Sequence, residues 1–419
     1  MSNFKSEFFN IMVERGFYNQ CTNENGFDSY LYECEKNGTP AVGYLGSDPT
    51  GDSLHVGHIV PLMMMRWFQK CGHKPLTLVG GATARIGDPS GKDKLRPFLT
   101  EETLQHNIKG LKKSFMKFLK FGDGANDAVM VDNWDWFKDI NYLAFLRDVG
   151  TYYSVNRMLT MDSVKSRLER EQPMSFLEFN YMLLQGYDFC ELYQKYNCRA
   201  QIAGSDQWGN ITSGTELGRR RHDVELFGFT SPIITDSNGK KMGKSEGNAV
   251  WINEDKLPSY DYFQYFRNIG DAEVGKCLRI YTDLSIDEIR RLEALKDQEI
   301  NEAKKILAYE ATKICRGESE AEAAKATAIK TFEQGGIGGE LPFIEKTNAE
   351  GVSILEAIVE IGWCASKGEV RRLIKQGGIK VNDKPVSDEN YCFSNTDVID
   401  GQIKIAQGKK KFGLIKIGA

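Results

Sequence analysis

The sequence predicts an α/β protein whose main part is a Rossmann-like, doubly wound parallel sheet with a helical insertion. A strand, a helix and a second strand follow one another within residues 41–83. A later strand at 199–203 again leads into a loop and a helix. The stretch 256–332 is helical in pattern and rich in Ala, Glu and Lys, and a basic tail follows it. We therefore expect an α-helical domain and then a small α+β domain after the sheet.

The first predicted strand, 41–48, is apolar enough to be buried. After the turn 49–52 the apolar residues recur at helical spacing as far as Cys71, and Lys74 to Thr83 form the next strand. Such a βαβ unit makes its two strands parallel. Because doubly wound sheets bind ligands at the carboxyl ends of their strands, we expect the functional site there.

Composition shifts divide the chain into regions. They are a sheet domain over 1–235 with a mostly helical insertion over about 98–198, a Gly-rich basic loop over 236–255, an α-helical domain over 256–332, a linker over 333–351 and a small domain over 352–419. The linker is predicted because Gln334 to Gly339 is glycine-rich.

The composition excludes several classes of protein. Of 419 residues, 41% are hydrophobic and 27% charged, which is typical of a globular protein and not of a disordered one. Apolar runs are far shorter than the roughly 20 residues of a membrane span. The N-terminus lacks the features of a signal or transit peptide, so we expect a cytoplasmic protein. Nine scattered cysteines without a C-x-x-C pair predict neither a disulfide framework nor a metal site.

Charge is unevenly distributed along the chain. Residues 352–419 hold eleven Lys and Arg against eight Asp and Glu, a net +3. Since the whole chain carries −4, the remainder carries −7. A basic appendage on an acidic body indicates contact with a polyanion, although a solvated domain surface would look the same.

The segment Asp48 to His58 is the first candidate site. Asp52 or Ser53 can cap the following helix, which would put His55 and His58 in or near its first turn. Free N–H groups and the helix dipole favour anions there, and Gly57 leaves room for a flat ligand. The alternative is two histidines that are merely exposed on one helix.

Two glycine-rich basic segments are the next candidates. Gly87-Asp-Pro-Ser-Gly-Lys92 fails as a P-loop because three residues, not four, separate its glycines. It still offers the Asp88 carboxylate and the Lys92 ammonium, unless it is only a structural turn. In Lys240-Lys-Met-Gly-Lys-Ser245, two lysines flank a glycine, which suits a mobile clamp on polyphosphate, or else a solvated loop.

Together these motifs resemble the class I aminoacyl-tRNA synthetases. His55-Val-Gly-His58 is similar to the HIGH signature of that family, and Lys241-Met-Gly-Lys-Ser245, about 185 residues later, to its KMSKS signature. The wider resemblance is to bacterial-type tyrosyl-tRNA synthetases and spans nearly the whole chain. It rests on Tyr44, Asp48-Pro-Thr50, Gly80-Gly-Ala-Thr83, Gly87 to Lys92, Leu184-Gln-Gly-Tyr-Asp-Phe189 and Gly204 to Ile211.

The resemblance implies a ligase that activates L-tyrosine with ATP and transfers tyrosine to the 3′-terminal adenosine of tRNA(Tyr). It further implies a homodimer, Mg²⁺ carried with ATP, and no tightly bound cofactor. Activation needs no general base, because the amino-acid carboxylate is already ionised at neutral pH. The enzyme must therefore supply alignment and charge stabilisation.

Tyr181, Gln185 and Asp188 share one face of a predicted helix, since they fall at i, i+4 and i+7. By resemblance, Asp188 and Tyr44 bind the substrate phenol. The implied tyrosine-binding residues are Tyr44, Asp88, Tyr181, Gln185, Asp188 and Gln207. The implied ATP-binding residues are Gly46, Asp48, His55, His58, Asp206 and Lys244. The implied catalytic residues are Thr50, His55, Lys92, Arg96, Lys241, Lys244 and Ser245.

The tail resembles the small RNA-binding domain shared with a ribosomal small-subunit protein. Ser366-Lys-Gly-Glu369 predicts a capping box at the start of a helix that ends at Gly377. Arg371, Arg372 and Lys375 on that helix would contact phosphates. The resemblance implies that this domain binds the long variable arm of the transfer RNA, with region 256–332 near the anticodon.

Three other functions remain open from the sequence. A tryptophanyl-tRNA synthetase shares both signatures but would have less use for Tyr44 paired with Asp188. A small-molecule adenylyltransferase shares the H-x-G-H pattern but would not need the second signature or the basic tail. An RNA-binding regulator without activity would not need the full set of polar residues.

Overall fold

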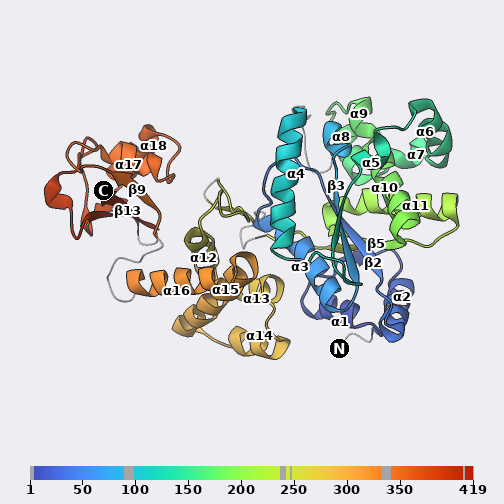
Figure 1. Cartoon of the computed structure of the whole chain (residues 1–419), viewed down its shortest axis with the longest axis horizontal. Coiled ribbons are helices and arrows are strands. Elements are labelled where there is room, and N and C mark those ends of the chain that lie inside the picture. Colours follow the sequence, from blue (N-terminus) through green and yellow to red (C-terminus); the bar gives the residue numbers. More distant parts are fainter. Residues whose placement is uncertain are drawn as a thin grey trace. The chain divides into compact units, whose positions relative to one another are not determined.

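The computed structural model describes residues 4–88, 99–235, 242–245, 248–332, 341–408 and 411–418 (Figure 1). They fall into two compact units, one of residues 1–257 with 265–316, the other of 258–264 with 317–419. Within the described ranges no helix combines the length and the apolarity needed to cross a membrane.

The first unit is built on a six-stranded sheet, which confirms the predicted fold class. Its strands, in spatial order, are β1 (Gln20–Cys21), β6 (Phe227–Ser231), β5 (Cys198–Gly204), β2 (Val42–Ser47), β3 (Lys74–Val79) and β4 (Val129–Asp132). Strand β1 pairs antiparallel with β6, and the other neighbours pair in parallel. The order reverses between β2 and β5, because the chain runs from β2 through β3 to β4 and then returns beside β2. That switch point is where a doubly wound sheet binds its ligand.

Helices surround this sheet (Figure 1). Those that precede, connect and follow the central strands are α1 (Glu7–Glu14), α2 (Glu24–Asn37), α3 (Val56–Lys70) and α11 (Trp208–His222). Helix α3 joins β2 to β3 and completes the predicted βαβ unit. It buries an apolar side that includes Ile59, Leu62, Met63 and Phe68.

The region 98–198, expected to be a mostly helical insertion, also supplies a strand of the sheet. Its helices are α4 (Glu101–Met116), α5 (Trp134–Phe137), α6 (Tyr142–Asp148), α7 (Val155–Met158), α8 (Asp162–Glu169), α9 (Phe176–Phe179) and α10 (Tyr181–Tyr196). Strand β4 lies within it and pairs with β3. Asn180 lies between α9 and α10 as the C-cap of one and the N-cap of the other, and its side chain donates to the Phe176 carbonyl.

The remaining helices of the first unit are α13 (Val274–Tyr281), α14 (Ile286–Glu293) and α15 (Ile300–Arg316). Helix α12 (Ser259–Arg267) begins in the second unit and ends in the first. Helix α16 (Glu318–Phe332) belongs to the second unit, whereas the sequence grouped it with the preceding helices.

The second unit also contains a five-stranded sheet covered by α17 (Ile354–Glu360) and α18 (Lys367–Lys375). The strand order is β11 (Lys384–Pro385), β10 (Ile379–Val381), β12 (Gln402–Gln407), β13 (Lys411–Ile417) and β9 (Phe343–Lys346). Strand β9 lies inside the predicted linker 333–351, so the linker prediction is wrong for these residues. Ile344 explains the difference, because it is buried in the core of this unit while β9 pairs in parallel with β13.

Candidate active site

The carboxyl ends of the parallel strands bring the predicted site residues together. Strand β2 leads into Asp48, β3 into Gly80, and β5 into the turn that carries Asp206 and Gln207. Gly80 allows the close approach of two of these ends. A Cβ atom on it would lie 2.1 Å from Oδ1 of Asp48 and 2.2 Å from Oγ1 of Thr83.

A chain of hydrogen bonds crosses the site from Asp48 to Asp188. Asp48 accepts from the hydroxyls of Thr83, at 2.7 Å, and Tyr181, at 3.1 Å. Nδ2 of Asn133 donates to Oγ1 of Thr83 and to Oδ2 of Asp188, both at 3.1 Å. The residue predicted for the nucleotide, Asp48, is thus tied to residues predicted for tyrosine.

The inner end of the site is a buried pair, Asp188 and Tyr44. Asp188 is 2% exposed, and its Oδ1 accepts from Nε1 of Trp136 at 2.9 Å. Burial raises the pKa of Asp188 well above its usual range, although the hydrogen bonds from Asn133 and Trp136 oppose that rise. Two donors fix the carboxyl group in position and leave it further capacity to accept.

Tyr44 is fully buried and packs edge-on against Phe189, with ring centroids 5.2 Å apart. Burial, and then the charge of Asp188, raise the pKa of its hydroxyl well above the usual value. Among the described residues this hydroxyl has no hydrogen-bond partner. A buried hydroxyl left unpaired costs about 1–3 kcal/mol. Its position beside Asp188 therefore suits a ligand that brings a polar group of its own.

The outer end of the site is rich in carboxylates. Burial raises the pKa of the Tyr181 hydroxyl well above its usual value, and the nearby charges of Asp48, Asp88 and Asp188 raise it further. Three acidic groups around one neutral phenol create a negative potential, which favours a cationic ligand group such as an ammonium.

Two glutamines complete this wall. Nε2 of Gln207 donates to Oδ2 of Asp88 at 2.9 Å, and its Oε1 accepts from Nδ2 of Asn210 at 3.1 Å. Gln185 is 9% exposed and lies on α10 between Tyr181 and Asp188. The predicted tyrosine-binding residues therefore gather at one place in the structure.

Helix α3 begins differently from the prediction. The N-cap is His55, not Asp52 or Ser53. Nδ1 of His55 accepts from the Gly57 amide at 3.0 Å, and Nδ1 of His58 accepts from the His55 amide at 3.3 Å. A histidine can cap here because its Nδ1 reaches the first turn as an Asp or Ser oxygen would. In this arrangement each neutral ring carries its proton on Nε2, which makes that nitrogen a donor.

The two signature segments are in close backbone contact. Gly243 has φ +110°, and a Cβ atom on it would lie 2.7 Å from the Gly57 nitrogen. A Cβ on Gly57 would lie 3.1 Å from the Met242 carbonyl oxygen. Glycine is therefore needed at both positions for the loop to approach the start of α3.

Several predicted residues lack a side-chain description. Lys92, Arg96 and Lys241 lie outside the described residues. Lys244 and Ser245 form strand β7, which pairs with β8 (Asn248–Ala249), but only their backbone is described. Three other residues predicted for ATP, Gly46, His58 and Asp206, are exposed, and so is Thr50, which was predicted to be catalytic.

The predicted RNA-binding residues lie on the outer side of α18. Val370 and Ile374 are buried, whereas Arg371, Arg372 and Lys375 are exposed. Ser366 caps the helix, but the reciprocal bond of the predicted capping box is absent. Glu369 accepts from the Ala365 amide instead of the Ser366 amide, because the chain turns one residue earlier.

The sequence did not single out Asn133, Trp136 or Gln201. Asn133 and Trp136 follow β4, a strand hidden in the region expected to be helical. Gln201 pairs with Tyr44 across β5 and β2 and is 2% exposed. Within the described part of the chain, its Oε1 has no hydrogen-bond partner. A glutamine inside a buried apolar strand was the available signal for this residue.

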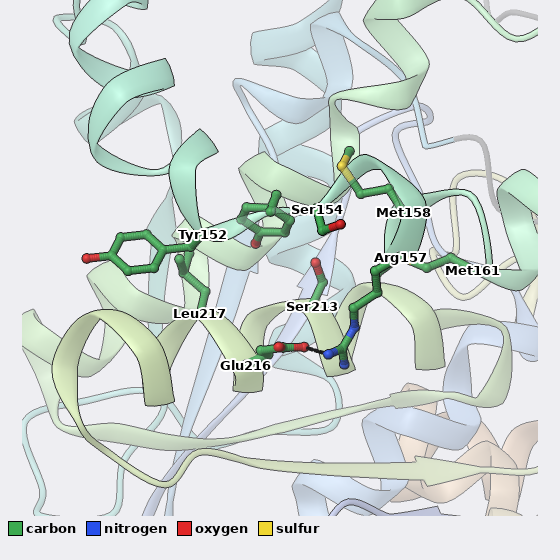
Figure 2. A pocket seen from close by; sticks show the side chains of 9 residues that line it. Tyr152, Ser154, Arg157, Met158, Met161, Ser213, Glu216 and Leu217 are labelled. Atoms are coloured by element: carbon green, nitrogen blue, oxygen red, sulfur yellow. Dashed lines mark ion pairs between the residues drawn. The ribbon is translucent and has the colours of Figure 1, made fainter.

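A hollow away from the candidate site lies between the insertion and α11 (Figure 2). Arg157 and Glu216, which form an ion pair there, are among the residues that line it. None of the predicted site residues that the structure describes lines this hollow, and its charged groups already neutralise each other. It is therefore a poor candidate for the reaction.

Comparisons with known proteins identify the family. The family model for tRNA synthetases class I (W and Y) matches residues 36–333, and that for the tyrosine--tRNA ligase SYY-like C-terminal domain matches residues 333–415. The tyrosine--tRNA ligase of Rhodospirillum rubrum is 51% identical over 416 residues, which cover 99% of this chain and 98% of that protein. The corresponding ligase of Novosphingobium aromaticivorans is 50% identical over 99% of this chain and all of its own length.

Solved structures give the same answer. A C-terminally truncated mitochondrial tyrosyl-tRNA synthetase from Aspergillus nidulans superposes with a TM-score of 0.69 at 29% identity. The match covers 78% of this chain and 94% of that one. The fold, the paired signatures and the full-length similarity lead to one conclusion: the chain belongs to the class I aminoacyl-tRNA synthetases and, within them, to the tyrosine--tRNA ligase family.

Proposed function

We propose that this chain joins L-tyrosine to tRNA(Tyr) in two steps, with tyrosyl-adenylate as the intermediate. The observation that carries the proposal is the buried pair of Asp188 and the Tyr44 hydroxyl, which has no hydrogen-bond partner within the described ranges. A substrate phenol can donate to Asp188 and accept from Tyr44, which would pair both groups. Phenylalanine would leave the Tyr44 hydroxyl without a partner, at a cost of about 1–3 kcal/mol, and Asp188 would keep only Asn133 and Trp136 as donors, so the site would reject it.

The other end of the amino acid would meet the acidic wall. The ammonium group can donate to Asp88, to the Tyr181 hydroxyl and to Gln185, while Gln207 holds Asp88 in place. This orientation directs the substrate carboxylate toward the start of α3. The structure of the wall thus supports a zwitterionic amino acid with a phenolic side chain.

In the first step a carboxylate oxygen of tyrosine attacks the α-phosphorus of ATP. A bond from that oxygen to phosphorus forms, the bond to the β-phosphate oxygen breaks, and pyrophosphate leaves. The protein supplies charge stabilisation in this step. The groups that would face the phosphates and ribose are Nε2–H of His55 and His58, the Thr50 hydroxyl and the N-terminus of α3. The cations of Lys92, Arg96, Lys241 and Lys244, with Ser245, would complete the clamp.

Mg²⁺ would accompany ATP on its phosphate oxygens, because this ion keeps several waters and favours substrate phosphates as ligands. In the second step a hydroxyl of the terminal ribose attacks the acyl carbon of the adenylate, and AMP leaves. Asp48, Gly46 and Asp206 would position the adenosine part.

The transfer RNA would be held in part by the second unit. Arg371, Arg372 and Lys375 present three cations on the exposed side of α18, and phosphate contacts need such cations. A protein that charges transfer RNA for translation would work in the cytoplasm.

We propose a homodimer as the working form. Large apolar side chains are unusually exposed in the segment 142–177, which indicates a surface that a second copy covers. They are Tyr142, Leu143, Val155, Leu159, Leu168, Phe176 and Leu177. Leu143→Asp combined with Phe176→Asp should convert a dimer to a monomer in light scattering. An unchanged mass would reject this surface.

The test of the reaction is exchange of labelled pyrophosphate into ATP, screened across the twenty amino acids. Exchange with tyrosine alone is the expected result. Exchange with tryptophan would assign the chain to the sister specificity, and exchange with no amino acid would favour a regulator without activity.

A further inference from the structure

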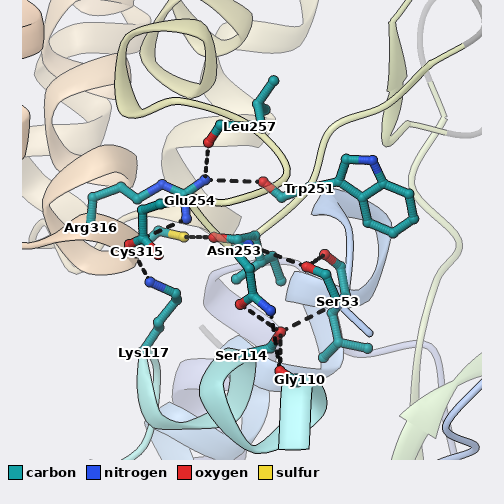
Figure 3. Close-up of polar contacts among 12 residues, drawn as sticks. Ser53, Gly110, Ser114, Lys117, Trp251, Asn253, Glu254, Leu257, Cys315 and Arg316 are labelled. Atoms are coloured by element: carbon teal, nitrogen blue, oxygen red, sulfur yellow. Dashed lines mark hydrogen bonds and ion pairs between the residues drawn. The ribbon is translucent and has the colours of Figure 1, made fainter. Parts of the chain in front are cut away.

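The segment 250–257, which follows the second signature, is fixed to the start of α3 (Figure 3). The Val56 amide donates to the Val250 carbonyl, and the Ile252 amide donates to the Leu54 carbonyl, both at 2.8 Å. His55 and Trp251 thereby face each other across a single antiparallel bridge. The C-terminal end of the signature loop is thus joined directly to the histidine that caps α3.

Asn253 is the centre of this junction. Its Nδ2 donates to the carbonyls of Asp52, at 3.1 Å, and Gly110, at 3.2 Å. Its Oδ1 accepts from the Ser114 hydroxyl at 3.0 Å, and its backbone amide donates to Oγ of Ser53 at 3.2 Å. The side chain is 2% exposed. One residue therefore connects the segment after the loop to the turn before α3 and to α4.

The same segment is held from its other side by the end of α15. The guanidinium of Arg316 donates to the carbonyls of Trp251, at 3.2 Å, and Leu257, at 3.1 Å. Between these two, the Cys315 thiol donates to the Ile252 carbonyl at 3.7 Å. Three backbone carbonyls of the segment are thus fixed, those of Trp251, Ile252 and Leu257, which makes it a firm base for the residues that precede it.

We propose that Asn253 is a positioning residue for adenylate formation: it sets where the Met242–Ser245 part of the loop stands relative to the HIGH-type turn. The inference rests on the proposed function. A loop that closes on polyphosphate can align its cations only if its base is fixed, since displacements of about 1 Å can cost about 100-fold in rate. Asn253 touches no reacting atom, and it acts through Leu54, His55 and the loop backbone.

The amide is chemically required at this position. Nδ2 supplies two donors to two carbonyl oxygens while Oδ1 accepts a hydroxyl, and only an amide does both. In Asn253→Asp the shape is kept and the Ser114 bond can remain. A carboxylate oxygen would then face the Asp52 and Gly110 carbonyls without a proton between them, which pushes the base away from α3.

The test compares Asn253→Asp with wild type in tyrosine-dependent pyrophosphate exchange. We expect kcat to fall at least 10-fold and KM for ATP to rise, while the Kd for tyrosine in equilibrium dialysis without ATP stays within twofold. Asn301→Asp makes the same chemical change at an exposed position on α15 and should leave all three values unchanged.

Unchanged kcat and KM for ATP in Asn253→Asp would overturn the inference, and so would a loss of tyrosine affinity that parallels the loss of exchange. Should that variant not fold, Ser114→Ala removes one bond to Asn253 and should lower kcat about threefold with tyrosine affinity intact. No effect of Ser114→Ala would then reject the role. Absence of tyrosine exchange in wild type would overturn the proposed function itself.

Discussion

Asn133 links the two ends of the candidate site through a single nitrogen. It donates to Asp188 and to Thr83, and Thr83 donates to Asp48. Asn133→Ala should therefore hold less firmly the Asp188 carboxyl group, which we propose binds the substrate phenol. Removing the donor to a buried acceptor costs about 1–3 kcal/mol, so KM for tyrosine should rise about 10-fold. Pyrophosphate exchange, measured at varied concentrations of tyrosine and of ATP, tests this expected rise in KM.

KM for ATP should change little in Asn133→Ala, because the histidines at the start of α3 keep their own hydrogen bonds. Trp136→Phe, which removes the other donor to Asp188, should act in the same direction. Equal increases in both KM values would mean that Asn133 supports the sheet and not the tyrosine site.

His73 makes the stability of the first unit depend on pH. Its side chain is 1% exposed, packed against Phe68 at 4.6 Å between ring centroids, with Glu35 3.5 Å away. Burial lowers the pKa of His73 to about 4. The unfolded chain binds this proton below about pH 6.5 and the folded chain does not, so stability is lost as pH falls from about 6.5 toward 4.

The free energy of unfolding should fall by about 2 kcal/mol between pH 7 and pH 5 because of this one group. His73→Phe keeps an aromatic ring among its neighbours and removes the titration. The free energy of unfolding should be measured by urea unfolding at pH 7 and at pH 5. The difference between these two free energies should be smaller in His73→Phe than in wild type by about 2 kcal/mol. A difference that stays the same would assign the acid sensitivity to other groups.

Residue spacing and the family resemblance together predicted which residues lie at the candidate site, and the limits of that prediction are physical. The pair His55 and His58 and the stripe of Tyr181, Gln185 and Asp188 are local patterns, which sequence displays directly. Asn133 reaches Asp188 only because β4 joins the sheet beside β3. That pairing is long-range, and the short strand stands between helices, so no local period indicated it.

At the scale of elements, the position of α4 depends on Gly110. A Cβ atom there would lie 1.9 Å from the Asp52 carbonyl oxygen. Asn107 of the same helix donates to the Pro49 carbonyl at 2.9 Å, so α4 lies directly against the turn before α3. Gly110→Ala should push α4 away from the turn before α3. The overpacking should lower the free energy of unfolding by about 1–3 kcal/mol.

Thermal unfolding of Gly110→Ala should show a lower Tm, and tyrosine-dependent exchange should fall with it. Gly368→Ala on α18 is the matched control, because the nearest atom to its Cβ would be Oγ of Ser366 at 3.8 Å. That variant should be neutral or slightly more stable. A Gly110→Ala protein with wild-type Tm would show that α4 can shift without loss.

Strand β9 shows why the boundary of the last domain could not be predicted. The glycines before it indicate a linker, and its four residues are too few for a periodic signal. Its place is set by β13, which lies about seventy residues later in the chain. Only the folded sheet makes Ile344 a core residue.

At the scale of the whole molecule, the pairing of β9 with β13 limits how the RNA-binding role can be tested. Removal of residues 352–419 would leave β9 without its partner β13. It would also remove Leu414, which packs with Tyr260 and Leu341 inside the second unit. Loss of RNA charging after such a deletion could therefore reflect an exposed apolar surface. Substitutions on the exposed side of α18 avoid that damage.

Replacement of Arg371, Arg372 and Lys375 by Ala removes three exposed cations and leaves the buried Val370 and Ile374 in place. Each lost phosphate contact should make binding less dependent on salt, so the slope of log Kd against log salt should fall by roughly 2–3. KM for tRNA(Tyr) in aminoacylation should rise at least 10-fold, while tyrosine-dependent pyrophosphate exchange stays at the wild-type rate. The exchange reaction is the internal control, since it needs no RNA. Wild-type aminoacylation by the triple variant would move the RNA contact away from α18, and a parallel loss of exchange would mean that α18 supports the active fold of the protein.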